Sequence, residues 1–125
     1  MNYNYLATVE RVVDGDTLDM LVDLGFDVSV RERFRVYGLN TPETHTTDAK
    51  EKAAGLAAKE FVTALLAKQP VPLAVTTHKD DKEKYGRYLA DVAITVDENG
   101  KPCATSLAAY LIGKGHGKAY FGGKR

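Results

Sequence analysis

Two short stretches of the sequence carry oxygen-rich groups suited to a hard metal ion. The first is "DGDT" (Asp14–Thr17) and the second is "NTPE" (Asn40–Glu43). Carboxylate, amide and carbonyl oxygens are the ligands that Ca²⁺ and Mg²⁺ prefer in proteins. Each stretch taken alone is more typical of an ordinary turn, because Asp-Gly and Pro-containing sequences are common between strands. Brought to the same end of a fold, the two stretches would form a metal pocket.

Arginines supply the opposite charge. Arg31, Arg33 and Arg35 occupy alternate positions, and "KYGR" (Lys84–Arg87) adds further basic groups. The planar guanidinium donates a fork of N–H groups that matches phosphate oxygens. Three cations along one side of a strand repel each other unless an anion lies among them. A phosphate would be that anion, with Arg31 and Arg33 interpreted as flanking or solvated charges. A solvated charged loop is the alternative interpretation of "KYGR".

Together these groups suit the hydrolysis of a phosphodiester bond. A hard cation orients the phosphate and screens its charge, while arginines stabilise the extra charge of the pentacovalent transition state. A carboxylate such as Glu43 can position or deprotonate the attacking water.

The elements that must position these groups begin with three strands. Alternating apolar residues and tight turns predict strands over 5–14, 17–24 and 28–37, joined as a meander. Successive side chains of a strand point to opposite faces, so Arg31, Arg33 and Arg35 are expected on the face opposite the core. The residues predicted to face the core are Leu18, Met20, Val22, Val30, Phe34 and Val36.

A loop over 38–47 is expected next, followed by the clearest helix of the sequence, within 46–69. Thr47 or Asp48 can cap its first turn, because a short polar side chain accepts hydrogen bonds from free backbone N–H groups there. The apolar stripe of this helix is predicted to consist of Ala54, Ala57, Ala58, Phe61, Val62, Leu65 and Leu66.

The remaining pattern completes a small mixed fold. The other expected elements are a fourth strand from Val71, a charged loop over 78–87, a fifth strand over 88–96, a turn over 97–100 and a short helix through Leu111 capped by Thr105 or Ser106. Five strands, with one helix between the third and the fourth, predict a mainly β fold with α elements. The expected architecture is a five-stranded OB-type barrel with a short C-terminal helix.

Composition limits the interpretation further. The 125 residues predict one domain over 1–125, and 17 basic against 17 acidic side chains give no overall field that would attract a polyanion. Any nucleic acid would have to be held by a local basic patch. Cys103, the only cysteine, is interpreted as a bystander, and His45, His78 and His116 as surface histidines. The sequence shows neither a leader nor a membrane span, so the chain is expected to be cytoplasmic or intracellular, with no membrane partner. Secretion is the alternative if a leader has been removed.

The motifs "VDGDT", "FRVYGLNTPE" and "KYGRYLADV" together resemble those of the staphylococcal nuclease (thermonuclease-like) family. The resemblance extends from about Val9 to Tyr120. It implies a five-stranded OB-type barrel that uses Ca²⁺, or another divalent cation, to hydrolyse DNA and RNA. A single-stranded substrate and a monomer are the corresponding expectations.

The resemblance also implies three sets of functional residues. The metal ligands would be Asp16, Asn40 and the Thr41 carbonyl. The catalytic groups would be Arg35, Glu43 and Arg87. The phosphate and the nucleotide would be held by Lys84, Tyr85 and Tyr120.

One departure concerns Asn40, which stands where the family usually has a second metal-binding carboxylate. One negative charge fewer predicts Ca²⁺ affinity about ten-fold weaker. The alternative function follows from the same residue. The chain would then be a catalytically weak or inactive OB module that binds single-stranded nucleic acid or a protein partner.

Overall fold

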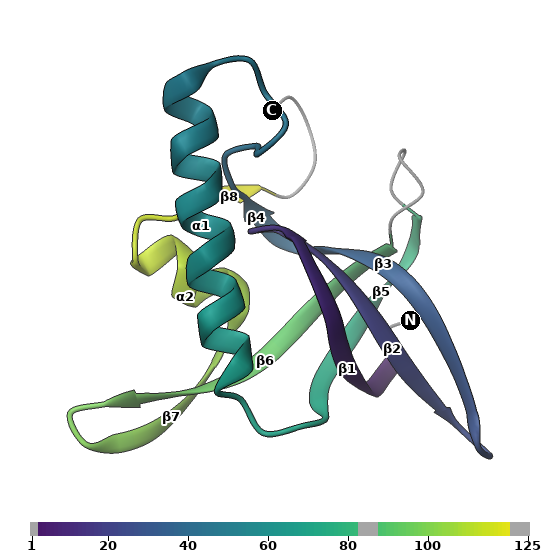
Figure 1. Ribbon diagram of the computed structural model, residues 1–125. Coiled ribbons are helices and arrows are strands. Elements are labelled where there is room, and N and C mark those ends of the chain that lie inside the picture. The colour runs from purple at the N-terminus through teal and green to yellow at the C-terminus, as the bar shows by residue number, and fades with distance from the viewer. Residues whose placement is uncertain (1–2, 83–87, 121–125) are drawn as a thin grey trace.

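The computed structural model describes residues 3–82 and 88–120, and in it the first three strands form the predicted meander (Figure 1). They are β1 (Tyr3–Asp14), β2 (Thr17–Gly25) and β3 (Val28–Val36), each antiparallel to the next. In the register of β2 with β3, Leu18 pairs with Phe34 on the core face. Thr17 pairs with Arg35 on the outer face.

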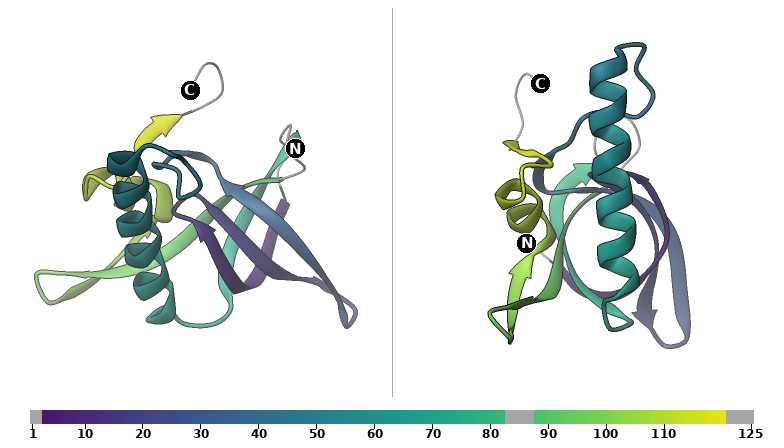
Figure 2. Two further views of the ribbon diagram at one scale, coloured as in Figure 1. Left: turned by 45° about the horizontal axis from the view of Figure 1, so that its top comes forward. Right: turned by 60° about the vertical axis from the view of Figure 1, so that its left-hand side comes forward.

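Two further strands close the sheet. β5 (Leu73–Lys82) pairs antiparallel with β1, and β6 (Tyr88–Glu98) pairs antiparallel with β5. The C-terminal end of β3, residues 34–36, is called its inner end below. It pairs parallel with β6, with Arg35 opposite Leu89. The closed order is therefore β1-β2-β3-β6-β5, which confirms the predicted five-stranded OB-type barrel. Figure 2 shows the ring of strands in its right-hand view, with α1 crossing in front of it.

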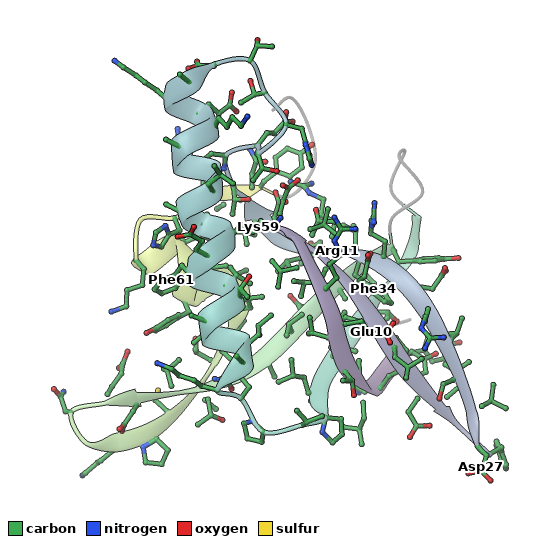
Figure 3. The ribbon with its side chains drawn as sticks, viewed as in Figure 1. Glu10, Arg11, Asp27, Phe34, Lys59 and Phe61 are labelled. Atoms are coloured by element: carbon green, nitrogen blue, oxygen red, sulfur yellow. The ribbon has the colours of Figure 1, made fainter. Side chains whose placement is uncertain are left out.

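Apolar side chains from these strands and the helices fill the interior. As predicted, Leu18, Met20 and Val22 are buried, and so are Phe34 and Val36. The prediction for Val30 was wrong, because this side chain is 38% exposed. It lies on the part of β3 that pairs with β2 but not with β6, where the hairpin has left the barrel. The hairpin tip is marked by Asp27 in Figure 3, far from α1.

The long helix α1 (Ala49–Ala67) begins where predicted. Asp48 is its N-cap, and its carboxylate accepts hydrogen bonds from the Lys50 and Glu51 backbone N–H groups. The predicted apolar stripe was only partly right, because Ala54 and Ala57 are exposed. The residues that α1 buries are Gly55, Ala58, Val62 and Leu66. Alanines on several sides of a helix define its buried face poorly, whereas the larger Val62 and Leu66 fix it.

Two short strands were not predicted, and they matter for the site. β4 (Gly38–Asn40) lies within the expected loop, and β8 (Lys118–Tyr120) lies in the glycine-rich tail. They pair antiparallel as a small separate sheet, with Gly38 opposite Tyr120. A strand of three residues is too short to show an alternating pattern in the sequence. This sheet lies beside the inner end of β3 (Figure 1).

The remaining elements correct several boundaries. β5 continues to Lys82 through the first part of the expected charged loop, and Val71 lies before it, 71% exposed. β7 (Lys101–Ser106) forms an unpredicted hairpin with β6. The short helix α2 (Leu107–Gly113) was predicted, with Ser106 as its cap. Among the helices of the described chain, none combines the length and the apolar character needed to cross a membrane.

Candidate functional site

The outer two arginines of β3 lie on the surface, where carboxylates neutralise them. Arg31 Nε donates to Glu10 Oε1 at 2.8 Å, and Arg33 Nε donates to Asp19 Oδ1 at 2.7 Å. The hydrogen bond from Arg33 holds the pKa of Asp19 below its usual value, and the same bond raises the pKa of Arg33. Both arginines are therefore engaged in surface ion pairs, which agrees with their interpretation as flanking charges.

Arg35 is buried, although it lies on the same outer face of β3. Only 4% of this residue is exposed, because the β4–β8 sheet covers this end of the barrel. Its Nη2 donates to the Leu39 carbonyl at 2.9 Å and to Asn40 Oδ1 at 3.4 Å, and lies 3.8 Å from Asp16 Oδ2. The Tyr120 ring lies 4.5 Å from the guanidinium carbon. The cation is thus held among oxygen atoms and against one aromatic ring.

Asp16 is equally buried, at 4% exposed, and it links three segments. Its Oδ2 accepts from the Thr41 backbone N–H at 3.1 Å, and its Oδ1 accepts from the Thr17 hydroxyl at 3.1 Å. Its backbone carbonyl accepts from the Val36 N–H at 2.8 Å. The turn between β1 and β2 is therefore fastened both to β3 and to the loop after β4.

The segment after β4 carries Glu43, whose side chain is exposed. Residues on either side of it are anchored to the end of β1 and to the turn that follows. Thr41 donates its N–H to Asp16, and the buried Thr44 donates its hydroxyl to Asp14 Oδ1. The carboxylate of Glu43 thus comes from a backbone segment that is fixed at both ends.

The structure brings some of the candidate residues together and leaves others undescribed. Oxygen atoms of Asp16 and Asn40 both lie close to one nitrogen atom, Nη2 of Arg35. Tyr120 contacts the same guanidinium. The three candidates of the β5–β6 connection, Lys84, Tyr85 and Arg87, lie outside the described residues.

The donors near Asp16 have the chemistry of a weak site for a hard cation. One carboxylate, the Asn40 amide and the Thr41 carbonyl are all hard oxygens. The buried Thr41 hydroxyl, which has no hydrogen-bond partner within the described chain, is a further hard oxygen on the same loop. Within residues 3–82 and 88–120, no group of three histidine, cysteine, aspartate or glutamate side chains is placed to hold a metal. A cation here would depend on neutral oxygens as well as carboxylates.

Sequence reasoning missed several residues that shape the site. The Leu39 carbonyl and the Thr44 hydroxyl act through contacts between distant segments, which no local pattern reveals. Gly55 is different, because a glycine inside a helical pattern is itself a signal of a close backbone approach. The predicted surface position of His78 was also wrong. It is half-buried, with Nε2 2.8 Å from Asp91 Oδ2.

Comparisons with known proteins agree with this architecture. Residues 33–124 match the model of a family described as staphylococcal nuclease homologue. A thermonuclease of Staphylococcus intermedius is 40% identical over 84 residues, which cover 67% of this chain and 46% of the relative. A thermonuclease of Staphylococcus hyicus is 36% identical with the same coverage. An uncharacterized protein of Methanocaldococcus jannaschii is 31% identical over 112 residues, which cover 77% of this chain and 52% of the relative.

These matches cover most of this chain but only part of each relative. The chain spans about half the length of the proteins that it matches. The family match covers the inner end of β3, the β4–β8 sheet and the loop that carries Glu43, so it includes most of the candidate site. The chain belongs to the staphylococcal nuclease family.

Proposed function

We propose that this chain is a nuclease that hydrolyses phosphodiester bonds of DNA or RNA with the help of a divalent cation, Ca²⁺ in the first instance. The observation that carries the proposal is the position of Arg35. Its buried Nη2 lies 3.8 Å from Asp16 Oδ2 and 3.4 Å from Asn40 Oδ1. A fixed cation beside hard oxygen donors matches the needs of a phosphate in transfer. Family membership and the two relatives named thermonuclease support the same reaction class.

Arg35 would stabilise charge that develops on the phosphate oxygens. Its guanidinium is already held by the Leu39 carbonyl and covered by the Tyr120 ring, so little reorganisation is needed when the substrate arrives. Burial also strengthens its electrostatic effect, because the surrounding medium screens charge less than water does. An exposed and paired arginine such as Arg33 offers neither advantage.

Glu43 would act on the attacking water. In the proposed reaction the water oxygen forms a bond to phosphorus while the bond to the 5′ oxygen breaks. The carboxylate of Glu43 accepts the proton that the water loses, and the departing oxygen gains a proton. Glu43 has the exposure that this role requires, and the anchors at Thr41 and Thr44 limit the movement of its backbone.

Asp16, Asn40 and the Thr41 carbonyl would hold the divalent cation. When bound there, the cation would orient the phosphate and offset its negative charge. Arg87 would provide a second guanidinium near the departing oxygen, and Lys84 and Tyr85 would hold a terminal phosphate and the nucleotide. These last three roles rest on the family resemblance. A single-stranded substrate is proposed on the same basis.

The test is degradation of denatured DNA and of RNA by the purified chain, in Ca²⁺ and again with a chelator. Cleavage that needs the metal, and that Glu43→Gln and Arg35→Ala both reduce by at least about 100-fold, is expected. Arg33→Ala is the matched control, since it removes an arginine of the same face and strand and should leave the rate within about two-fold.

The alternative function is a separate outcome of this assay. Binding of single-stranded nucleic acid without cleavage in Ca²⁺, Mg²⁺ and Mn²⁺ would contradict the enzyme. It would instead support an OB module in which Asn40 marks weakened metal binding.

A further inference from the structure

Gly55 lies on the buried face of α1, directly against the loop that carries Glu43. A Cβ atom built at Gly55 would lie 2.5 Å from the Glu43 carbonyl oxygen and 2.7 Å from the Glu43 carbonyl carbon. It would also lie 2.8 Å from the Pro42 carbonyl oxygen. Non-bonded carbon atoms pack at about 3.5–4.0 Å. Only the hydrogen of a glycine therefore fits between the helix and this loop.

The backbone conformation of Gly55 does not explain why glycine is present. The residue sits inside α1 without a left-handed φ, and alanine is the more favourable residue at such a position. A second helical glycine gives the contrast. At Gly113, in the last turn of α2, an added Cβ would meet nothing within 4 Å. The requirement for glycine at position 55 thus comes from the approach of the Pro42–Glu43 backbone.

The loop is also held from its other side. The Thr44 hydroxyl donates to Asp14 at the end of β1, and the Thr41 N–H donates to Asp16 in the turn that follows. The backbone of Glu43 therefore lies between two fixed surfaces, the face of α1 at Gly55 and this turn. Figure 1 shows the same arrangement at the level of the ribbon, with the loop after β4 running beside the N-terminal half of α1.

We propose that Gly55 is a positioning residue for Glu43, and that the hydrogen bond of Thr44 to Asp14 is the opposing anchor. This inference rests on the proposed function, because it assigns Gly55 its effect through the carboxylate that would act on water. An added methyl group would push the Glu43 backbone away by about 1 Å, the distance needed to restore normal contact. Misplacement of a reacting group by about 1 Å can slow a reaction by about 100-fold.

The first experiment compares Gly55→Ala with Gly113→Ala, which adds the same methyl group to a helix in open space. We expect Gly55→Ala to lower kcat by about 10- to 100-fold, with KM and the Ca²⁺ dissociation constant within about three-fold of wild type. Gly113→Ala should leave all three quantities within about two-fold. Equal activity of Gly55→Ala and wild type would overturn the proposal, and so would an equal loss in both variants.

A double variant separates positioning of Glu43 from general damage. If Gly55 acts through Glu43, adding Gly55→Ala to Glu43→Gln should lower the remaining activity by less than about two-fold. A further ten-fold or greater loss in the double variant would show an effect independent of Glu43, and would contradict the proposed role.

A second site tests the same idea should Gly55→Ala fold poorly. Thr44→Val keeps the shape of the side chain and removes the hydroxyl that Asp14 accepts. It should reduce kcat by about 3- to 10-fold with KM unchanged, and an unchanged kcat would count against the opposing anchor.

A structural readout distinguishes failure of this inference from failure of the proposed function. Backbone amide chemical shifts of Thr41, Glu43 and Thr44 are expected to change in Gly55→Ala and to stay as in wild type in Gly113→Ala. If the wild type is inactive but Gly55→Ala changes these shifts, the proposed nuclease activity is overturned while the contact between Gly55 and the loop is supported. An active wild type with no such change would overturn the role of Gly55 alone.

Discussion

Arginine side chains at the two ends of β3 lie in opposite environments, exposed at one end and buried at the other. At the outer end Arg31 and Arg33 project from the β2–β3 hairpin, and Glu10 and Asp19 pair with them in contact with solvent. At the inner end Arg35 occupies the next position on the same face, yet it is buried beneath the β4–β8 sheet. The difference shows that the elements packed over a strand, more than the alternation of its side chains, determine whether an arginine is exposed or buried.

The energetic consequences differ accordingly. An exposed ion pair contributes about 0–1 kcal/mol, because water and salt screen it and two long side chains lose freedom. A buried guanidinium has lost most of its hydration, so its fixed acceptors matter more. Arg35 has the Leu39 carbonyl at 2.9 Å and the Asn40 amide oxygen at 3.4 Å. In the proposed function an incoming phosphate would meet this guanidinium, whose planar fork of N–H groups matches phosphate oxygens.

The largest expected effect comes from replacing the arginine at the inner end of β3, compared with replacing those at the outer end. Arg35→Ala should lower kcat/KM on denatured DNA by at least about 100-fold, whereas Arg31→Ala and Arg33→Ala should each change it by less than about two-fold. Arg35→Lys keeps the charge but not the planar fork, and should recover only part of the activity. Comparable losses at positions 33 and 35 would remove the distinction between the two ends.

A second change sharpens the electrostatics of the inner end. Asn40→Asp places a second carboxylate next to Asp16 and should tighten Ca²⁺ binding by about ten-fold, or about 1.4 kcal/mol. Isothermal titration measures this directly. Asn99→Asp, in the exposed turn of the β6–β7 hairpin, adds the same charge elsewhere and should leave the affinity unchanged. A titration that Asn40→Asp does not alter would count against Asn40 as a metal ligand.

The third prediction concerns the ring that covers Arg35. Tyr120→Leu removes the aromatic face 4.5 Å from the guanidinium carbon, and should reduce activity by about 3- to 30-fold, the range of a desolvated cation–π contact. Tyr120→Phe keeps the ring and should stay within about two-fold. In an Arg35→Ala background, Tyr120→Leu should add little. A large added loss there would favour a direct contact of Tyr120 with the nucleotide.

Much of this fold could be predicted from local patterns. The alternation of Leu18, Met20 and Val22 defined a core face correctly, and the caps at Asp48 and Ser106 begin their helices as expected. These features depend on residues within one or two turns of each other, so the sequence shows them directly. The barrel followed from the number and order of such elements.

The burial of Arg35 could not be predicted in this way. Alternation correctly assigned it to the outer face, but its cover comes from β8, which lies about 80 residues further along the chain and is too short to show periodicity. The pairing of Arg33 with Asp19 likewise depends on the register between two strands. Gly55 was not singled out from the sequence, although a glycine inside a helical pattern is unusual, and its partner became apparent only once the loop of Glu43 was placed against it.

The smallest expected effect is the pH-dependent contribution of the Arg33–Asp19 ion pair, at the outer end of β3, to stability. Because Arg33 donates a hydrogen bond to it, Asp19 has a folded-state pKa below the usual value of an aspartate. A depressed carboxyl pKa stabilises the fold above the unfolded-state pKa, and this stabilisation is lost as pH falls through the folded-state value. Asp19→Asn should therefore lower the free energy of unfolding by no more than about 1 kcal/mol between pH 5 and pH 8, and by progressively less toward about pH 2.

Urea unfolding of wild type and Asp19→Asn at several pH values measures this difference. The difference should also shrink in about 1 M salt, since the pair is exposed to solvent. Asp23→Asn, at another acidic position of β2, offers a comparison without an arginine partner among the described ion pairs. A difference for Asp19→Asn that grows as pH falls would have the wrong sign for an ionised Asp19 held by Arg33. It would mean that an ionised Asp19 does not neutralise Arg33, and the contrast drawn between Arg33 and Arg35 would then fail.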